Sequence, residues 1–153
     1  MNKQTIPYSK TTFFSSLIND YLANEKKLHP FINHKCSLQA FADVIAERKQ
    51  TSVNRELLAK QLQEQYKDLP ISNTVKANIE QLKNSNCFTI TTGHQLNLFT
   101  GPLYFIYKII SAINLAKTLK ATYPENDFVP VYWMATEDHD FEEINHFNLF
   151  KER

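Results

Sequence analysis

The stretch CFTITTGHQLNLFTGPLYFIYKIISAINLAKTLK, residues 87–120, and the octet FVPVYWMA, residues 128–135, decide the fold of this chain. Residues 87–91 are short, apolar and β-prone, which predicts a strand. Pro102 suits the first position of a helix that runs to about Lys120, and the breadth of its apolar surface predicts cover on more than one side. The octet is almost continuously apolar, as strands buried on both faces are, and it predicts a second strand.

A strand, a helix and a second strand in this order form a βαβ unit, whose strands run parallel with a right-handed crossover. The segments after the two strands, residues 92–101 and 136–146, then leave the sheet at the same carboxyl edge, where ligands bind in open α/β sheets. The sequence therefore predicts an α/β fold with a helical amino-terminal segment and the first βαβ unit of a Rossmann-like parallel sheet. We expect this sheet to be incomplete, because two isolated strands are marginally stable and residues 146–150 have the pattern of a third.

Upstream of the first strand, apolar residues recur at helical spacing around residues 13–22, 38–45, 57–62 and 75–82. The expected helix N-caps are Ser37, Thr51 or Ser52, and Ser72, and a turn is expected at residues 84–86. The chain is therefore divided into a helical lead-in that packs on the core, residues 1–85, and the start of the sheet domain, residues 86–153.

Composition and charge exclude several classes of protein. Seventeen basic and sixteen acidic residues leave a net charge of +1, and no run of Lys or Arg forms a nucleic-acid footprint. The apolar runs are shorter than the roughly 20 residues of a membrane span. The opening MNKQTIPYSK lacks the apolar core of a secretory signal, and Cys36 and Cys87 lack the spacing of a disulfide framework or a zinc site. These features predict a cytoplasmic protein that binds neither nucleic acid nor membrane.

The chain has two glycines, Gly93 and Gly101, where an average composition would supply about ten, and both lie in TTGHQLNLFTGP. Glycine is used where backbone freedom or the close approach of a ligand is required. The segment ends at a predicted helix amino terminus, which favours a bound anion. Inside that helix, Tyr104, Tyr107, Lys108 and Ser111 share one face, and Lys108 is placed to neutralise a carboxylate or a phosphate. The alternative is a glycine-bearing turn followed by a helix with a solvated face.

The second segment, TEDHDFEEINH (residues 136–146), carries five carboxylates and two histidines directly after a buried strand. Mutual repulsion lets one carboxyl group keep its proton near neutral pH and act as a general acid or base, and histidine titrates in the same range. Two alternatives remain. The acidic side chains are simply solvated, with Asp140 and Glu143 forming a helix cap, or His139, Asp140, Glu143 and His146 serve a metal-dependent hydrolase. Because the order is not H-E-x-x-H and no distant third ligand is evident, no metal site is predicted.

At this point the sequence resembles a known family. TTGHQLNLFTGPLYFIYKIISAINLAK and VPVYWMATEDHDFEEINH are similar to the amino-terminal Rossmann-like region of the bacillithiol biosynthesis cysteine-adding enzymes, and the segment LHPFINH extends the resemblance over nearly the whole chain. The resemblance implies a ligase that joins cysteine to glucosaminyl-malate in the last step of bacillithiol biosynthesis. It also makes residues 86–153 the start of a domain of the nucleotidylyl-transferase type. ATP is a candidate cofactor by that likeness, but Thr91 stands where the superfamily signature His-x-Gly-His has its first histidine, so the activating cofactor is left open.

The residues that combine chemistry and position are assigned as follows. The expected catalytic residues, which orient substrates or move protons, are His94, Asp138, His139 and Asp140. The expected substrate-binding residues are Gly93, Gln95, Thr100, Gly101, Tyr104, Tyr107, Lys108, Glu137 and Asn145.

Members of that family are several times longer than this chain. We therefore expect an amino-terminal fragment, a truncated gene product or half of a split enzyme, inactive alone and completed by the missing carboxyl-terminal part. A homo-oligomer is compatible with the sequence. The remaining alternative is a non-catalytic remnant that binds a partner through its helical half.

Overall fold

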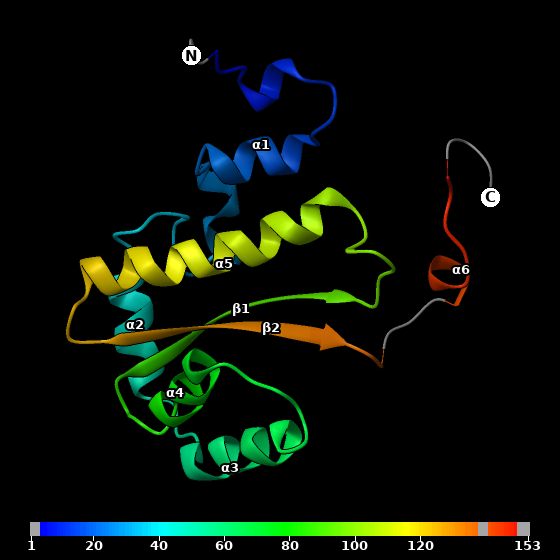
Figure 1. Ribbon diagram of the computed structural model, residues 1–153. Helices are drawn as coiled ribbons and strands as arrows, with labels where there is room; N and C mark the ends of the chain where they lie inside the picture. The colour runs from blue at the N-terminus through cyan, green and yellow to red at the C-terminus, as the bar shows by residue number, and fades with distance from the viewer. Residues whose placement is uncertain (1–3, 138–140, 150–153) are drawn as a thin grey trace. The chain divides into compact units, whose positions relative to one another are not determined.

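Two parallel strands, β1 (Cys87–Gln95) and β2 (Asp127–Ala135), form the sheet in the computed structural model, which describes residues 4–137 and 141–149 (Figure 1). The register pairs Cys87 with Asp127 and Gln95 with Ala135, so both strands start and end together. The parallel βαβ unit predicted from the sequence is confirmed. One boundary was wrong, because β1 continues past Thr91 to Gln95. The strand therefore includes Gly93, His94 and Gln95, which take part in its pairing with β2. The loop begins only after Gln95.

Helix α5 (Leu103–Thr122) makes the crossover and lies along one face of the sheet, where it contacts both strands (Figure 1). Ala112, Ala116 and Leu119 are its buried residues. The expected broad cover was wrong for the described part of the chain, because Leu103 and Ile110 remain exposed. Pro102 was predicted at the first helical position, but it is the N-cap and has an extended backbone, so α5 starts one residue later than predicted. No side chain caps this end of α5.

Helices α3 (Arg55–Tyr66) and α4 (Asn73–Gln81) lie on the other side of the sheet (Figure 1). The core on this side consists of Leu82, Cys87 and Val129, with Leu62 and Val131 packed against them. The Arg55 guanidinium donates to the carbonyls of Leu82 and Cys87 and so ties the start of α3 to the start of β1.

Two of the expected helix caps can be compared with the structure of these helices. Ser72 caps α4 as predicted, with its hydroxyl accepting from the N–H of Val75. Thr51 or Ser52 was the wrong choice for α3, because the amide oxygen of Asn54 accepts from the N–H of Leu57. Asparagine is as good an N-cap as serine, and Asn54 is the residue that directly precedes the first helical turn.

The chain forms two compact units, residues 1–51 and 52–153, so α3 and α4 belong to the same unit as the sheet. The proposed boundary between residues 85 and 86 stays a prediction. The first unit contains η1 (Tyr8–Lys10), α1 (Ser16–Leu22), η2 (Lys26–Phe31) and α2 (Phe41–Lys49). The second unit also contains α6 (Phe141–Ile144), and the sheet of the described residues contains no third strand. Nowhere in residues 4–137 or 141–149 is there a helix with the length and apolar character needed to cross a bilayer.

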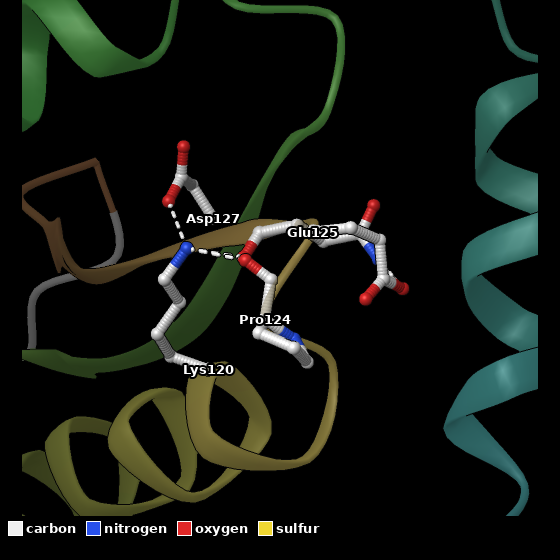
Figure 2. Close-up of polar contacts among 5 residues, drawn as sticks. Lys120, Pro124, Glu125 and Asp127 are labelled. Atoms are coloured by element: carbon white, nitrogen blue, oxygen red, sulfur yellow. Dashed lines mark hydrogen bonds and ion pairs between the residues drawn. The ribbon is translucent and has the colours of Figure 1, made fainter.

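The turn between α5 and β2 is held by the ammonium group of Lys120. Lys120 Nζ donates to the carbonyl oxygens of Pro124 at 2.8 Å and Asn126 at 3.1 Å, and it pairs with Asp127 Oδ1 at 2.8 Å. Figure 2 shows the side chain reaching from the last turn of α5 toward Pro124 and Asp127. The contacts fix where α5 stops and where β2 starts, at the end of the sheet opposite its carboxyl edge.

Replacing Lys120 by methionine should lower the free energy of unfolding by about 1 kcal/mol, since the ammonium is lost while the aliphatic stem remains. The expected loss of free energy is small because the Lys120 side chain is 51% exposed and water screens its ion pair. The midpoint of urea unfolding measures the effect. Lys117→Met, one turn earlier on α5, is the matched control and should be neutral. Equal stability of the two variants would contradict the role given to Lys120.

The two cysteines differ in environment, and this predicts their reactivity. Burial raises the pKa of the Cys87 thiol to about 11 from an ordinary 9.0, with the nearby Asp127 carboxylate adding to the rise. Cys36 is exposed. A thiol reagent should therefore modify Cys36 in the native protein and Cys87 only after unfolding, and Cys36→Ser should remove the fast reaction. Fast modification of Cys87 would disprove its burial.

The raised pKa of Cys87 also predicts that the free energy of unfolding falls between pH 9 and about 11, where the thiol ionises in the unfolded chain but not in the native one.

Candidate functional site

The carboxyl ends of the two strands bring the candidate segments to one edge. Because Gln95 pairs with Ala135, the chain leaves the sheet at the same level after β1 and after β2. A ring contact between Phe99 and Phe147, with centroids 5.1 Å apart, joins the first segment to the residues that follow α6. The common edge predicted from strand direction is therefore present in the described part of the chain.

His94 lies at this edge and is held on both ring nitrogens. Its Nε2 lies 2.8 Å from the hydroxyl of Tyr104, and its Nδ1 lies 3.0 Å from the carbonyl oxygen of Gln95. The imidazole also packs against the ring of Tyr104, with centroids 5.3 Å apart, and edge-on against Phe105 at 5.9 Å. Tyr132 of β2 donates from its hydroxyl to the carbonyl of His94 at 3.2 Å. These contacts fix the orientation of the imidazole.

Asn97 completes the surroundings of His94, and sequence reasoning missed it. Its amide Nδ2 lies 2.8 Å from His94 Nδ1 and 2.9 Å from the carbonyl oxygen of Gln95. The available signal was its place between the two glycines, four residues before Gly101, since asparagine side chains often anchor loop backbone. Tyr132 and Phe105 were also missed, because an apolar strand and helix pattern does not mark a residue that touches the site.

Each glycine makes room for a protein group, which differs from the ligand approach expected from the sequence. A Cβ on Gly101 would lie 2.5 Å from Asn97 Oδ1, and Gly101 has φ +57°. A Cβ on Gly93 would lie 2.8 Å from the carbonyl oxygen of Trp133 on β2. The lack of a Cβ at Gly101 thus leaves room for the Asn97 side chain, and the lack of a Cβ at Gly93 leaves room for the neighbouring strand. Phe99 and Thr100 also have positive φ values, 49° and 70°, so the exposed Thr100 lies in a left-handed turn.

The polar face of α5 is present as expected. Tyr104, Tyr107, Lys108 and Ser111 line a cavity of about 400 Å³ beside β1, together with Thr91 and Thr92. Lys108 reaches back to the strand and donates from its ammonium group to the carbonyl oxygen of Gly93. The uncapped amino end of α5 leaves backbone N–H groups near this face. The arrangement combines a cation, phenol hydroxyls and an imidazole, which is a suitable set for holding an oxyanion and moving a proton.

The second segment is described in part. Glu137 Oε1 accepts from the indole N–H of Trp133 at 3.3 Å, and Asn145 Oδ1 lies 2.6 Å from His146 Nδ1. Neither residue has a described contact with His94 or Tyr104. Asp138, His139 and Asp140 lie outside the described residues, so two of the four members of the alternative metal set, His139 and Asp140, are outside them. Among the described residues, no three His, Cys, Asp or Glu side chains are grouped as metal ligands.

A second cavity, of about 710 Å³, runs along the free edge of β2. Its wall is mostly apolar and is formed by α4, α5 and β2, with Val75, Ile113 and Pro130 among the lining residues. Although this cavity is larger than the one beside β1, its lining lacks histidine, and its paired charges, Lys120 and Asp127, are those that hold the turn before β2. His94, Tyr104 and Lys108 therefore remain the candidate site of this unit.

Comparisons with known proteins agree with the fold. Residues 1–153 match the model of a family described as bacillithiol biosynthesis BshC, N-terminal Rossmann-like domain. A protein of Flavobacterium johnsoniae named "Putative cysteine ligase BshC" is 55% identical over 151 residues, which cover 97% of this chain and 28% of the relative. Proteins of the same name from Christiangramia forsetii and Bacillus cytotoxicus are 52% and 33% identical, over 97% and 85% of this chain and 28% and 24% of the relatives. The chain thus spans about a quarter of the length of the relatives that it matches.

Proposed function

Since the chain belongs to the bacillithiol biosynthesis BshC family through its N-terminal Rossmann-like domain, we propose that it forms the first part of a cysteine ligase. The reaction would form an amide bond between the carboxyl carbon of cysteine and the amino nitrogen of glucosaminyl-malate. One carboxyl oxygen would leave as water in a direct condensation, or with the activating phosphate-bearing group if ATP takes part. The name of the relatives supports the ligase class, and the two substrates are part of the proposal. A cytoplasmic location also belongs to the proposal, because two unpaired cysteines suit a reducing compartment.

The observation that carries this proposal is the grouping of His94, Tyr104 and Lys108 at the carboxyl edge of the sheet. Amide formation needs a held carboxylate and a group that takes a proton from the attacking amine. Lys108 and Tyr104, with the amino end of α5, would hold the anionic group. His94 would take the proton, because its imidazole is the general base at this edge and lies beside the phenol.

The other predicted residues take supporting roles in the same proposal. Gln95, Tyr107 and Thr100 would bind substrate from the first segment and from α5. Glu137, Asn145 and the carboxylates of Asp138 and Asp140 would approach from the second segment, with His139. Gly93 and Gly101 would contribute indirectly, because their lack of a side chain permits the backbone conformation and the close packing of the site. Whether ATP activates the cysteine carboxylate is a question that the experiment answers directly.

Because the chain spans about a quarter of its relatives, the test uses an extended enzyme. This is a fusion of residues 1–153 to the part of the Flavobacterium johnsoniae relative that follows its matching region. Cysteine and glucosaminyl-malate are supplied with and without ATP, and bacillithiol is measured by mass spectrometry. We expect product from the extended enzyme and from the relative, and none from residues 1–153 alone.

Each outcome decides one part of the proposal. If neither the relative nor the extended enzyme forms product under either condition, the cysteine ligase assignment fails. If residues 1–153 form product without the rest, the expectation of an inactive fragment fails. Product that forms only with ATP would indicate an activated carboxylate, and product that forms without ATP would indicate a direct condensation.

A further inference from the structure

Strand β2 pairs with β1 on one side, and its other side is a free edge of the sheet in the described part of the chain. The N–H of Asp127 donates to the carbonyl oxygen of Asn86, just before β1, so Asp127 faces β1. Alternate residues of a strand direct their backbone groups to the same neighbouring strand, and the residues between them direct theirs to the opposite side. The N–H groups of Phe128, Tyr132 and Met134 therefore point to the free edge.

Pro130 belongs to the same alternate set, so its nitrogen also lies on the side of the free edge. Proline has no N–H, and at a position that faced β1 it would have removed a bond between the two strands. Facing outward, it leaves donors on both sides of a one-residue gap. Proline on a free edge opposes the pairing of such edges between two copies of a protein. The gap therefore favours a dedicated partner strand over a second copy of this chain.

The cavity of about 710 Å³ along this edge has walls on both faces of the sheet (Figure 1). Val75 of α4 lines one wall, and Ile113 of α5 lines the other. The edge itself contributes Val131, which packs toward the Leu82 core, and Tyr132, whose ring contacts Phe105 of α5. A strand that is covered by helices on both faces is apolar along its length. The mostly apolar cavity has the character that such a strand requires.

The outer edge of β1 is used in a different way. The same alternation turns the carbonyl oxygens of Cys87 and Gly93 away from β2, and side chains of this chain already donate to both. The Arg55 guanidinium donates to Cys87 at 3.0 Å, and the Lys108 ammonium donates to Gly93. The cavity on this side is lined by β1 and α5 and belongs to the candidate site. The free edge of β2 is therefore the better place for a further strand.

We propose that the free edge of β2, between α4 and α5, binds one apolar β-strand from the part of the enzyme beyond this chain, through the N–H groups of Phe128, Tyr132 and Met134. The relatives have the length to supply it, because the matched region is 28% of the Flavobacterium johnsoniae protein. Two strands alone are marginally stable, so the added strand would also stabilise the sheet. The inference rests on the proposed function only in taking the chain as the first part of a longer enzyme.

The test compares hydrogen exchange of single backbone amides in residues 1–153 and in the extended enzyme, by mass spectrometry with electron-transfer fragmentation. In the chain alone, the amide of Val131, which faces β1, should exchange slowly, and those of Tyr132 and Met134 should exchange quickly. In the extended enzyme the rates at Tyr132 and Met134 should fall about tenfold or more relative to Val131, the equivalent of one hydrogen bond. If the fusion does not fold, the same part of the relative is added as a separate protein.

Two substitutions on α5 test the cavity with the same change of side chain. Ile113 lines the cavity, whereas Ile110, one turn earlier, is not among its lining residues, and both are exposed. In the extended enzyme, Ile113→Glu places a carboxylate in the wall and should restore fast exchange at Tyr132 and Met134. Ile110→Glu should leave the exchange slow. Both variants should fold as isolated chains, because each glutamate is in contact with water there.

Three results would overturn the inference. The first is fast exchange at Tyr132 and Met134 in the folded extended enzyme. The second is slow exchange of these amides in the monomeric chain alone, which would show that the edge is already covered. The third is protection in the chain alone that rises with concentration as sedimentation detects dimers, which would make a second copy the occupant. Because no activity is measured, a failure of the cysteine ligase proposal would leave the exchange result intact.

Discussion

Replacing Gly93 with valine is expected to lower the free energy of unfolding by about 3 kcal/mol, at the upper end of the cost of overpacking. A Cβ at this position would lie 2.8 Å from the carbonyl oxygen of Trp133 and 3.0 Å from its Cβ. Both groups are fixed in the neighbouring strand, so the ends of β1 and β2 would have to separate. That cost is a large fraction of the stability of a single domain.

Denaturant unfolding of the chain measures the loss, with Thr91→Val as the matched control. Thr91 is exposed on β1 two residues earlier and therefore shares the face of Gly93, and its substitution should change the free energy of unfolding by less than about 0.5 kcal/mol. Gly93→Ala should lie between the two. If Gly93→Val is as stable as the control, the close approach of the strands does not explain the glycine.

Replacing His94 with glutamine should lower kcat/KM of the extended enzyme by about 100-fold or more, the usual contribution of a general acid or base. Glutamine keeps an acceptor and a donor within reach of Tyr104 but cannot carry a proton between substrates. The comparison with His94→Ala is therefore informative. Equal losses in both variants support proton transfer.

A different pattern would assign His94 another role. If glutamine retains kcat/KM within tenfold while alanine does not, His94 acts by hydrogen bonding alone, and the proton must go to a group of the second segment. Circular dichroism of each variant provides the folding control. His34→Gln changes a histidine of the first compact unit that has no role in the proposed site, and it should leave kcat/KM unchanged.

Much of the fold could be predicted because local patterns carry it. The apolar octet at residues 128–135, the turn at residues 84–86 and the cap at Ser72 depend on neighbours in the chain, and the structure contains all three. Strand direction followed from the crossover, because a helix that runs back along the sheet returns the chain to the end at which the first strand began. The end of β1 was missed because Gly93 and His94 disfavour a strand locally. They join one because β2 supplies a partner for each residue up to Gln95.

The candidate site divides in the same way. The sequence alone predicted the common edge of the sheet, the polar face of α5 and the candidate residues His94, Tyr104 and Lys108, because strand order and helical spacing are periodic properties. Only the tertiary structure decided what the glycines are for and which residue holds His94. Gly93 faces a carbonyl of another strand, and Gly101 faces the side chain of Asn97. Such contacts depend on the distance between segments in space, and no spacing along the chain encodes that distance.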